Sequence, residues 1–240
     1  MTISKDNTVA SVVTKNIKTA HIFKKHGIDF CCGGGISLEK ACGKNDVNID
    51  VLMNDLSLID VVTDKSQDFD TWELDTLIDY IVNTHHSYVS ESVLILSQYA
   101  NKVAKVHGHH YEFLLEVNTL FHEVAEELIS HMQKEEQVLF PYIKSLVATK
   151  NNNNTSTPPP FGSVTNPIAM MEHEHENAGE VLRKIAALTS NYTTPDGACN
   201  TFKALYSKLE EFEQDLHQHI HLENNILHPK AIVLEQSLTK

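Results

Sequence analysis

The sequence predicts an all-α protein, in which a small helical domain precedes a bundle of four long helices. From Trp72 onward every long segment repeats its apolar residues at the helical period, and almost none alternates as a strand does. A His-x-x-x-Glu motif, followed at equal offsets by Leu and Pro, occurs at His131 and again at His219. The copies lie 88 residues apart (219 minus 131), which indicates an internal duplication.

The N-terminal domain is expected at residues 1–64 and the bundle at residues 73–235. In the first domain a helix over 9–25 ends before Gly27, since glycine is a natural helix stop. Two shorter helices are expected around 37–42 and 48–60. Three polar or Gly/Pro-containing segments separate the elements. They are a linker at 64–71, a crossover at 151–160 between the duplicated halves, and a break at 191–197.

Helical periodicity selects one inward histidine in each half of the duplication. In residues 74–99 the apolar stripe contains His85, and a rotation of about 100° per residue takes His86 off it. In residues 167–188 the stripe contains His175 and excludes His173. The two motif helices continue the pattern. Their stripes read Val124, Leu128, His131, Glu135, Val138 and Tyr142, and Phe212, Leu216, His219, Glu223 and Ile226.

This arrangement favours a two-metal site over a set of core histidines. One histidine on an apolar stripe is as compatible with a hydrogen-bonded core residue as with a ligand. A carboxylate on such a stripe is costly unless it is paired or bound to a metal, and both Glu135 and Glu223 follow an inward histidine by one turn. Nitrogen and oxygen donors on four helices suit two irons bridged by these glutamates. We expect the other histidines to be solvated, with His107 left open: His109, His110, His122, His217, His221 and His228.

Longer strings in four places resemble one family. They are the string from His131 to Pro141, the string from Met171 to Gly179, the string from Leu222 to Leu227, and Cys31-Cys32-Gly33. With them the chain resembles the RIC (repair of iron centres) family of ScdA/YtfE-like proteins, which have a hemerythrin-like bundle. The resemblance implies a centre of two non-haem irons, oxo- or hydroxo-bridged, and a role in repairing iron-sulfur clusters damaged by nitric oxide or oxidants. The implied ligands are His85, His131, Glu135, His175, His219 and Glu223.

The predicted site is more open than that of an oxygen-carrying hemerythrin. Such proteins have a second histidine four residues after the one on the third helix, and here that position is Gly179. Glu127 and Glu174 are candidates for orienting ligands or relaying protons, or are ordinary surface acids. Damaged iron-sulfur proteins would be the clients, and nitric oxide and oxygen the small ligands. Two alternatives stay open: a nitric oxide reductase that forms nitrous oxide, and a sensor or carrier of oxygen or nitric oxide.

The Cys31-Cys32-Gly-Gly-Gly turn is the second chemical feature. Adjacent cysteines neither chelate one metal easily by themselves nor form an unstrained disulfide, so a reactive thiol is favoured over two small buried residues. Backbone N–H groups of the turn are expected to lower a thiol pKa. We assign the pair a redox, iron-handover or partner-contact role.

Composition excludes several function classes. With 32 acidic and 19 basic residues the net charge is -13, which argues against binding to nucleic acid or anionic membranes. No apolar run approaches a membrane span, and the first residues lack the features of a secretory signal, so a cytoplasmic location is expected. Four scattered cysteines form no disulfide framework. Oligomeric state is left open, a homodimer included.

Overall fold

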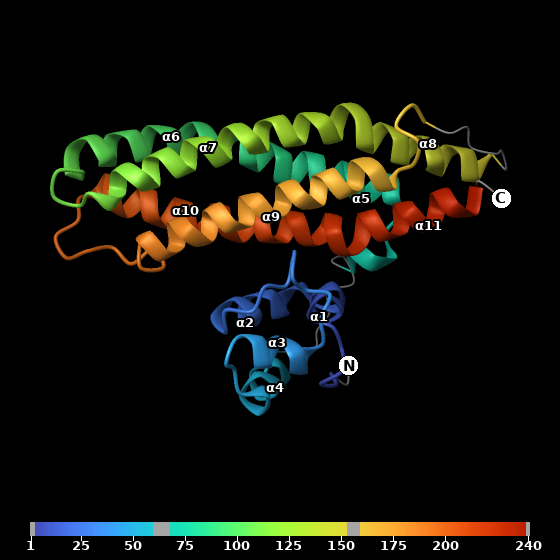
Figure 1. Ribbon diagram of the computed structural model, residues 1–240, viewed down its shortest axis with the longest axis horizontal. Helices are drawn as coiled ribbons and strands as arrows, with labels where there is room; N and C mark the ends of the chain where they lie inside the picture. Colours follow the sequence, from blue (N-terminus) through green and yellow to red (C-terminus); the bar gives the residue numbers. More distant parts are fainter. Residues whose placement is uncertain (1–2, 60–67, 153–158, 239–240) are drawn as a thin grey trace. The chain divides into compact units, whose positions relative to one another are not determined.

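The computed structural model describes residues 3–59, 68–152 and 159–238, and its regular structure is helical (Figure 1). No strand occurs within these ranges, where an isolated antiparallel bridge joins Thr8 and Ser37. The predicted all-α fold is confirmed. Half of the predicted linker at 64–71 and most of the predicted crossover at 151–160 lie outside the described residues.

Short helices precede long ones along the chain. The N-terminal elements are α1 (Val9–Lys15), the 3-10 turn η1 (Ile17–Thr19), α2 (Ala20–Lys25), α3 (Leu38–Lys44), α4 (Ile49–Ser57) and the 3-10 turn η3 (Phe69–Thr71). The later elements are α5 (Leu74–Tyr80), η4 (Ile81–His86), α6 (Ser87–His107), α7 (Phe113–Lys134), η5 (Glu135–Leu139), α8 (Phe140–Asn151), α9 (Thr165–Leu188), α10 (Asn200–Leu222), η6 (Glu223–Leu227) and α11 (His228–Leu238).

The chain divides into two compact units. Unit 1 takes its described residues from 1–78, 146–157 and 218–240, and unit 2 takes them from 79–145 and 158–217. Unit 1 therefore combines the N-terminal helices with the C-terminal end of the chain. The domain boundaries at 64 and 73 stay a prediction from the sequence.

Unit 2 is a bundle of four long helices, α6, α7, α9 and α10 as far as His217, which run alongside one another in Figure 1. Their apolar stripes form its core, in which Leu96, Phe121, Leu182 and Phe212 are at most 1% exposed. The rings of Phe121 and Phe212 meet edge to face with centroids 5.8 Å apart. Burial of these stripes is the main stabilising contribution, and it confirms the predicted four-helix bundle.

The N-terminal part of unit 1 is built from capped short helices. Thr8, Ser37 and Asn48 each accept a hydrogen bond from a backbone N–H in the first turn of α1, α3 and α4. The single helix predicted over 9–25 is wrong, because Asn16 has an extended backbone and its side chain accepts from the N–H of Lys18. That cap ends α1 and starts η1, which leads into α2.

Three of the long helical runs are interrupted by a π-helix. Two of these segments, η5 and η6, start at the glutamate of a His-x-x-x-Glu motif, and the third, η4, ends at His86. A π-helix bonds residue i to residue i+5, so it inserts one residue into the turn and shifts the inward positions that follow. Such segments often occur at functional sites.

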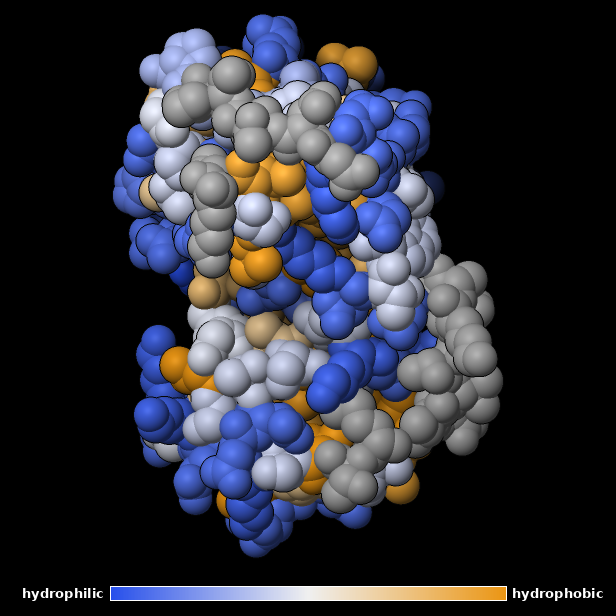
Figure 2. Space-filling model, turned by 90° about the vertical axis from the view of Figure 1, so that its right-hand side faces the viewer, coloured by the Kyte–Doolittle hydropathy of each residue, from blue (hydrophilic) through white to orange (hydrophobic). Residues whose placement is uncertain are grey.

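The surface that Figure 2 shows is largely polar. On the face drawn in Figure 2, hydrophilic residues predominate and hydrophobic ones show in separate places. Across the described part of the chain, none of the helices has the length and hydropathy needed to span a membrane.

Candidate metal centre

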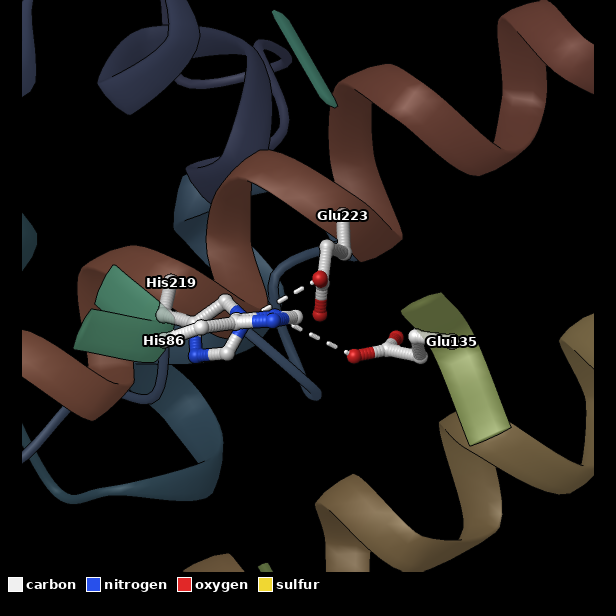
Figure 3. A group of neighbouring side chains, drawn as sticks. All are labelled: His86, Glu135, His219 and Glu223. Carbon is white, nitrogen blue, oxygen red and sulfur yellow. Dashed lines mark hydrogen bonds and ion pairs between the residues drawn. The ribbon is translucent and has the colours of Figure 1, made fainter. Parts of the chain in front are cut away.

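Six buried side chains form two overlapping groups of possible metal ligands. The first group is His86, Glu135, His219 and Glu223, whose side chains point toward one another in Figure 3. The second keeps both glutamates and replaces the histidines with His131 and His175. Within each group the ligand atoms lie within 4.8 Å of one another. Two neighbouring ligand groups that share two carboxylates form the arrangement expected of a bridged two-metal centre.

The nitrogens that face the two groups are the Nε2 atoms of the histidines. Glu135 Oε2 lies 3.4 Å from His86 Nε2 and 3.3 Å from His131 Nε2. His131 Nε2 lies 3.0 Å from His175 Nε2, and His219 Nε2 lies 3.0 Å from Glu223 Oε1. Glu135 Oε2 is thus close to one histidine of each group, which places this carboxylate between the two groups.

Burial tests whether a metal fits here. None of the six side chains is more than 3% exposed, and both glutamates are fully buried. Taking so many ionisable groups out of water is costly unless a bound cation compensates them. Imidazole nitrogens and carboxylate oxygens together suit iron, whereas structural zinc favours a closed tetrahedral set. The donor set therefore fits two irons.

The structure places His86, and not His85, in the first group. The prediction from the sequence counted 100° per residue throughout, which put Ile81 and His85 on one stripe. Because Ile81–His86 is a π-helix, the residue one turn after Ile81 is His86, five positions on. His85 is buried as well, but its Nδ1 lies 2.9 Å from Asp215 Oδ1 and it belongs to neither His/Glu group of the described residues.

The same effect appears on the first motif helix. Val138, expected on the inward stripe, is 45% exposed, and Leu139 is 1% exposed in its place. Tyr142 was likewise expected on this stripe, but it is only partly buried, and its neighbour Ile143 is fully buried. Both shifts follow the π-helix Glu135–Leu139 and have the size of one residue. His131 and Glu135 precede the shift, so their predicted inward orientation agrees with the structure.

Comparison with known proteins identifies the bundle. Residues 77–231 match the family described as "Hemerythrin HHE cation binding domain". The chain belongs to the hemerythrin HHE family. Residues 5–60 match the ScdA_N family, a domain of unknown function (DUF542). The chain is 37% identical to the "Iron-sulfur cluster repair protein YtfE" of Yersinia pseudotuberculosis (strain PB1/+) over 211 residues, 88% of this chain and 90% of that relative. It is also 37% identical to the protein of that name from Yersinia pestis (strain Pestoides F) over 215 residues, 90% and 91% of the two chains.

Two carboxylates outside the groups orient histidines of this HHE bundle. His131 Nδ1 lies 2.8 Å from Glu174 Oε2, and His86 Nδ1 lies 2.7 Å from Glu136 Oε1. A carboxylate that accepts the Nδ1 proton leaves Nε2 unprotonated and directed at a metal. The sequence predicted the role of Glu174 and missed that of Glu136. Glu136 follows the ligand candidate Glu135 directly, but this position indicates a role only once His86 is known to face inward.

Glu174 is held in its charged form. Partial burial raises the pKa of this carboxyl, but hydrogen bonds from Lys134 and His131 outweigh burial and lower its pKa overall. Glu174 therefore stays ionised at neutral pH and can accept from His131. Glu127, the other proposed outer acid, is exposed on α7.

An additional histidine of the hemerythrin type is absent from α9. Gly179, one turn after His175, is buried and supplies no side-chain donor. The two groups together therefore offer six possible protein ligands among the described residues.

The cysteine turn differs from expectation in its electrostatics. The N–H groups of Cys31 and Cys32 donate to Asp29 Oδ1, at 2.9 and 3.1 Å, and not to a thiol. A side-chain hydrogen bond with Cys32, burial and the nearby Asp29 charge together raise the pKa of Cys31 well above its usual range. The expected lowering of a thiol pKa is wrong for Cys31. Cys32 is more exposed than Cys31.

Two histidines expected in solvent are buried. His221 and His228 are both fully buried. Within unit 1, the N-terminal helices pack on the segment that starts at Gln218, so the outer side of this helix is covered. His221 Nε2 lies 3.4 Å from Thr14 Oγ1, and its ring lies edge-on to Phe30 at 5.9 Å. The prediction failed because it treated the bundle as the sole packing partner of this helix.

Proposed function

We propose that this protein holds two irons through His86, His131, Glu135, His175, His219 and Glu223, and that it repairs iron-sulfur clusters by supplying iron. The observation that carries the proposal is the sharing of Glu135 and Glu223 between two buried His/Glu groups. The similarity to relatives named iron-sulfur cluster repair proteins supports iron-sulfur clusters as the target of the repair. Clients would be iron-sulfur proteins in the cytoplasm that have lost iron.

The residues of the chain set up iron binding and release. Glu136 and Glu174 hold the Nδ1 protons of His86 and His131, so both Nε2 atoms are available as donors. Bound iron would supply one-electron redox chemistry and affinity for diatomic molecules such as nitric oxide. Four histidines and two carboxylates satisfy fewer positions than two six-coordinate irons offer. Incomplete protein ligation favours exchange of small ligands and metal release over permanent storage.

Iron transfer tests the proposal. Protein loaded with ⁵⁷Fe is incubated anaerobically with an apo iron-sulfur protein, sulfide and a reductant, and cluster formation is followed by Mössbauer spectroscopy. We expect labelled iron in the acceptor, and no transfer from a Glu135→Ala, Glu223→Ala variant that cannot load iron. Labelled iron that stays with the donor while the acceptor remains without clusters would contradict iron supply.

A second function rests on the same open positions. Removal of nitric oxide, by binding or by reduction to nitrous oxide, needs a free coordination position, and Gly179 leaves one by supplying no ligand. Binding and reduction are separated by gas-phase analysis of nitrous oxide after nitric oxide is added to the reduced protein with an excess of a chemical reductant, because each nitrous oxide formed consumes two electrons and two protons. More than one nitrous oxide molecule per centre would establish turnover. The absence of nitrous oxide would refute reduction of nitric oxide, and iron transfer that stays intact would then favour repair by iron supply.

A further inference from the structure

Apart from the His/Glu groups, one more set of described side chains places metal-ligating atoms together. Asp29, Cys31 and Cys32 each bring one ligand atom within 4.8 Å of the others. The two sulfur atoms are 3.9 Å apart, and Cys31 Sγ is 3.2 Å from Asp29 Oδ1. From the sequence, the two adjacent cysteines are not expected to chelate a metal by themselves. Asp29 changes that conclusion because it adds a third donor on the same side of the turn.

The turn is fixed before any ligand arrives. Both N–H groups that donate to Asp29 Oδ1 belong to the cysteines themselves, so the carboxylate and the thiols are held as one unit. Gly34 allows the turn to close, since a Cβ at this position would lie 2.4 Å from the carbonyl oxygen of Phe30. Ala10 N donates to Gly34 O at 2.8 Å, which attaches the turn to α1. Prearranged donors of this kind lower the cost of binding a cation.

The turn is also attached to the helical segment that carries a shared glutamate. Asn225 Nδ2 donates to Cys31 O at 3.0 Å, and Asn225 lies in η6, two residues after Glu223. His221, which contacts Phe30, lies two residues before Glu223. A hydrogen bond from the Asn225 side chain thus joins the thiol turn to the π-helix that begins at Glu223, within unit 1.

We propose that Asp29, Cys31 and Cys32 form a second metal site, which binds a thiophilic divalent cation and passes iron to or from the His/Glu groups. Two sulfurs and one oxygen select Fe²⁺, Co²⁺ or Zn²⁺ over Mg²⁺ and Ca²⁺. Three protein ligands leave a fourth position open for water or for a ligand from another molecule, as in catalytic zinc sites. Binding releases the thiol protons to solvent, and no electron transfer is required. The binding of the cation is independent of the proposed repair function, whereas its role in passing iron rests on that function.

Cobalt tests the binding. Co²⁺ is titrated anaerobically into the reduced full-length protein after its His/Glu groups have been loaded with iron, and thiolate-to-cobalt charge-transfer absorption is recorded. We expect one cobalt per chain with this absorption in the wild type, weaker binding in Asp29→Asn, and loss of the absorption in Cys32→Ser. Cys32 is the less buried cysteine of the pair, and the fold of the variant is checked by circular dichroism. Cys199→Ser is the matched control. The thiol of exposed Cys199 lies 3.3 Å from His107 Nε2, so this pair could also bind cobalt.

The outcomes separate the site from the repair function. No charge-transfer absorption in the wild type, or absorption that survives Cys32→Ser and disappears in Cys199→Ser, would overturn the site. Cobalt binding that depends on Cys32, in a wild type that transfers no iron, would leave the site standing and refute repair by iron supply. Slower iron transfer by Cys32→Ser, with both irons retained, would support both proposals.

Discussion

Acidification should destabilise the protein through one buried imidazole, that of His221. Burial lowers the pKa of His221 to about 4 from 6.5, although a backbone hydrogen bond with Phe30 opposes the change. Between these values the unfolded chain carries a proton that the folded chain does not. The stabilisation is therefore complete above pH 6.5 and is lost as the pH falls toward 4. The full difference corresponds to about 3 kcal/mol, of which about 2 kcal/mol is lost at about pH 5.

The measurement is a comparison of the wild type with His221→Gln. Glutamine removes the titrating group and keeps a polar partner for Thr14 and Asn225, which both contact the imidazole. Free energies of unfolding in urea are measured at about pH 7.5 and about pH 5, on protein from which metal has been removed. The wild type should lose about 2 kcal/mol more than the variant between the two conditions. His109→Gln, at an exposed position, should behave as the wild type does.

The reasoning depends on the imidazole staying neutral in the folded state. Equal losses in the wild type and in His221→Gln would show that it does not, and would refute the assignment. A loss that is also reduced in His109→Gln would point to a general charge effect and not to His221.

Three further predictions concern the metal centre and the core. His86→Ala should lower iron content to one per chain or less, whereas His85→Ala should retain two, as measured by elemental analysis; the reverse result would restore the unshifted helical register. Glu174→Gln should weaken iron binding by about 10- to 100-fold in chelator competition, because His131 loses its charged partner, while exposed Glu176→Gln should not. Leu182→Ala, at a fully buried position, should lower the free energy of unfolding by about 2–5 kcal/mol in thermal or urea denaturation, and a loss below 1 kcal/mol would mean that the core is not packed there.

Helical periodicity predicts most of this fold because the bundle depends on local patterns. The long helices and the break between α9 and α10 follow from apolar spacing and from polar or glycine-containing segments. Periodicity fails where the period itself changes, and three π-helices change it. For this one reason the sequence places Val138 on an inward stripe and His86 off one. A π turn leaves no simple residue signature, although two adjacent histidines at a single-ligand position were a usable warning.

Other parts of the site depend on contacts between distant segments. The burial of His221 requires Thr14 and Phe30, about two hundred positions away in the chain, and no pattern within α10 encodes it. Asn225 reaches Cys31 in the same way. The chemistry of the cysteine turn could not be deduced from the cysteines alone, since Asp29 determines it.

The composition of the two His/Glu groups bears on the origin of the chain. Each group takes two ligands from the first copy of the duplicated sequence and two from the second. A chain of half this length would offer each metal only half of its ligands, whereas two such chains related by a twofold axis would offer all of them. A centre of this design is accessible to an ancestral homodimer but not to an ancestral monomer. Fusion of the two copies would then have allowed each half to change separately while the shared carboxylates kept them together.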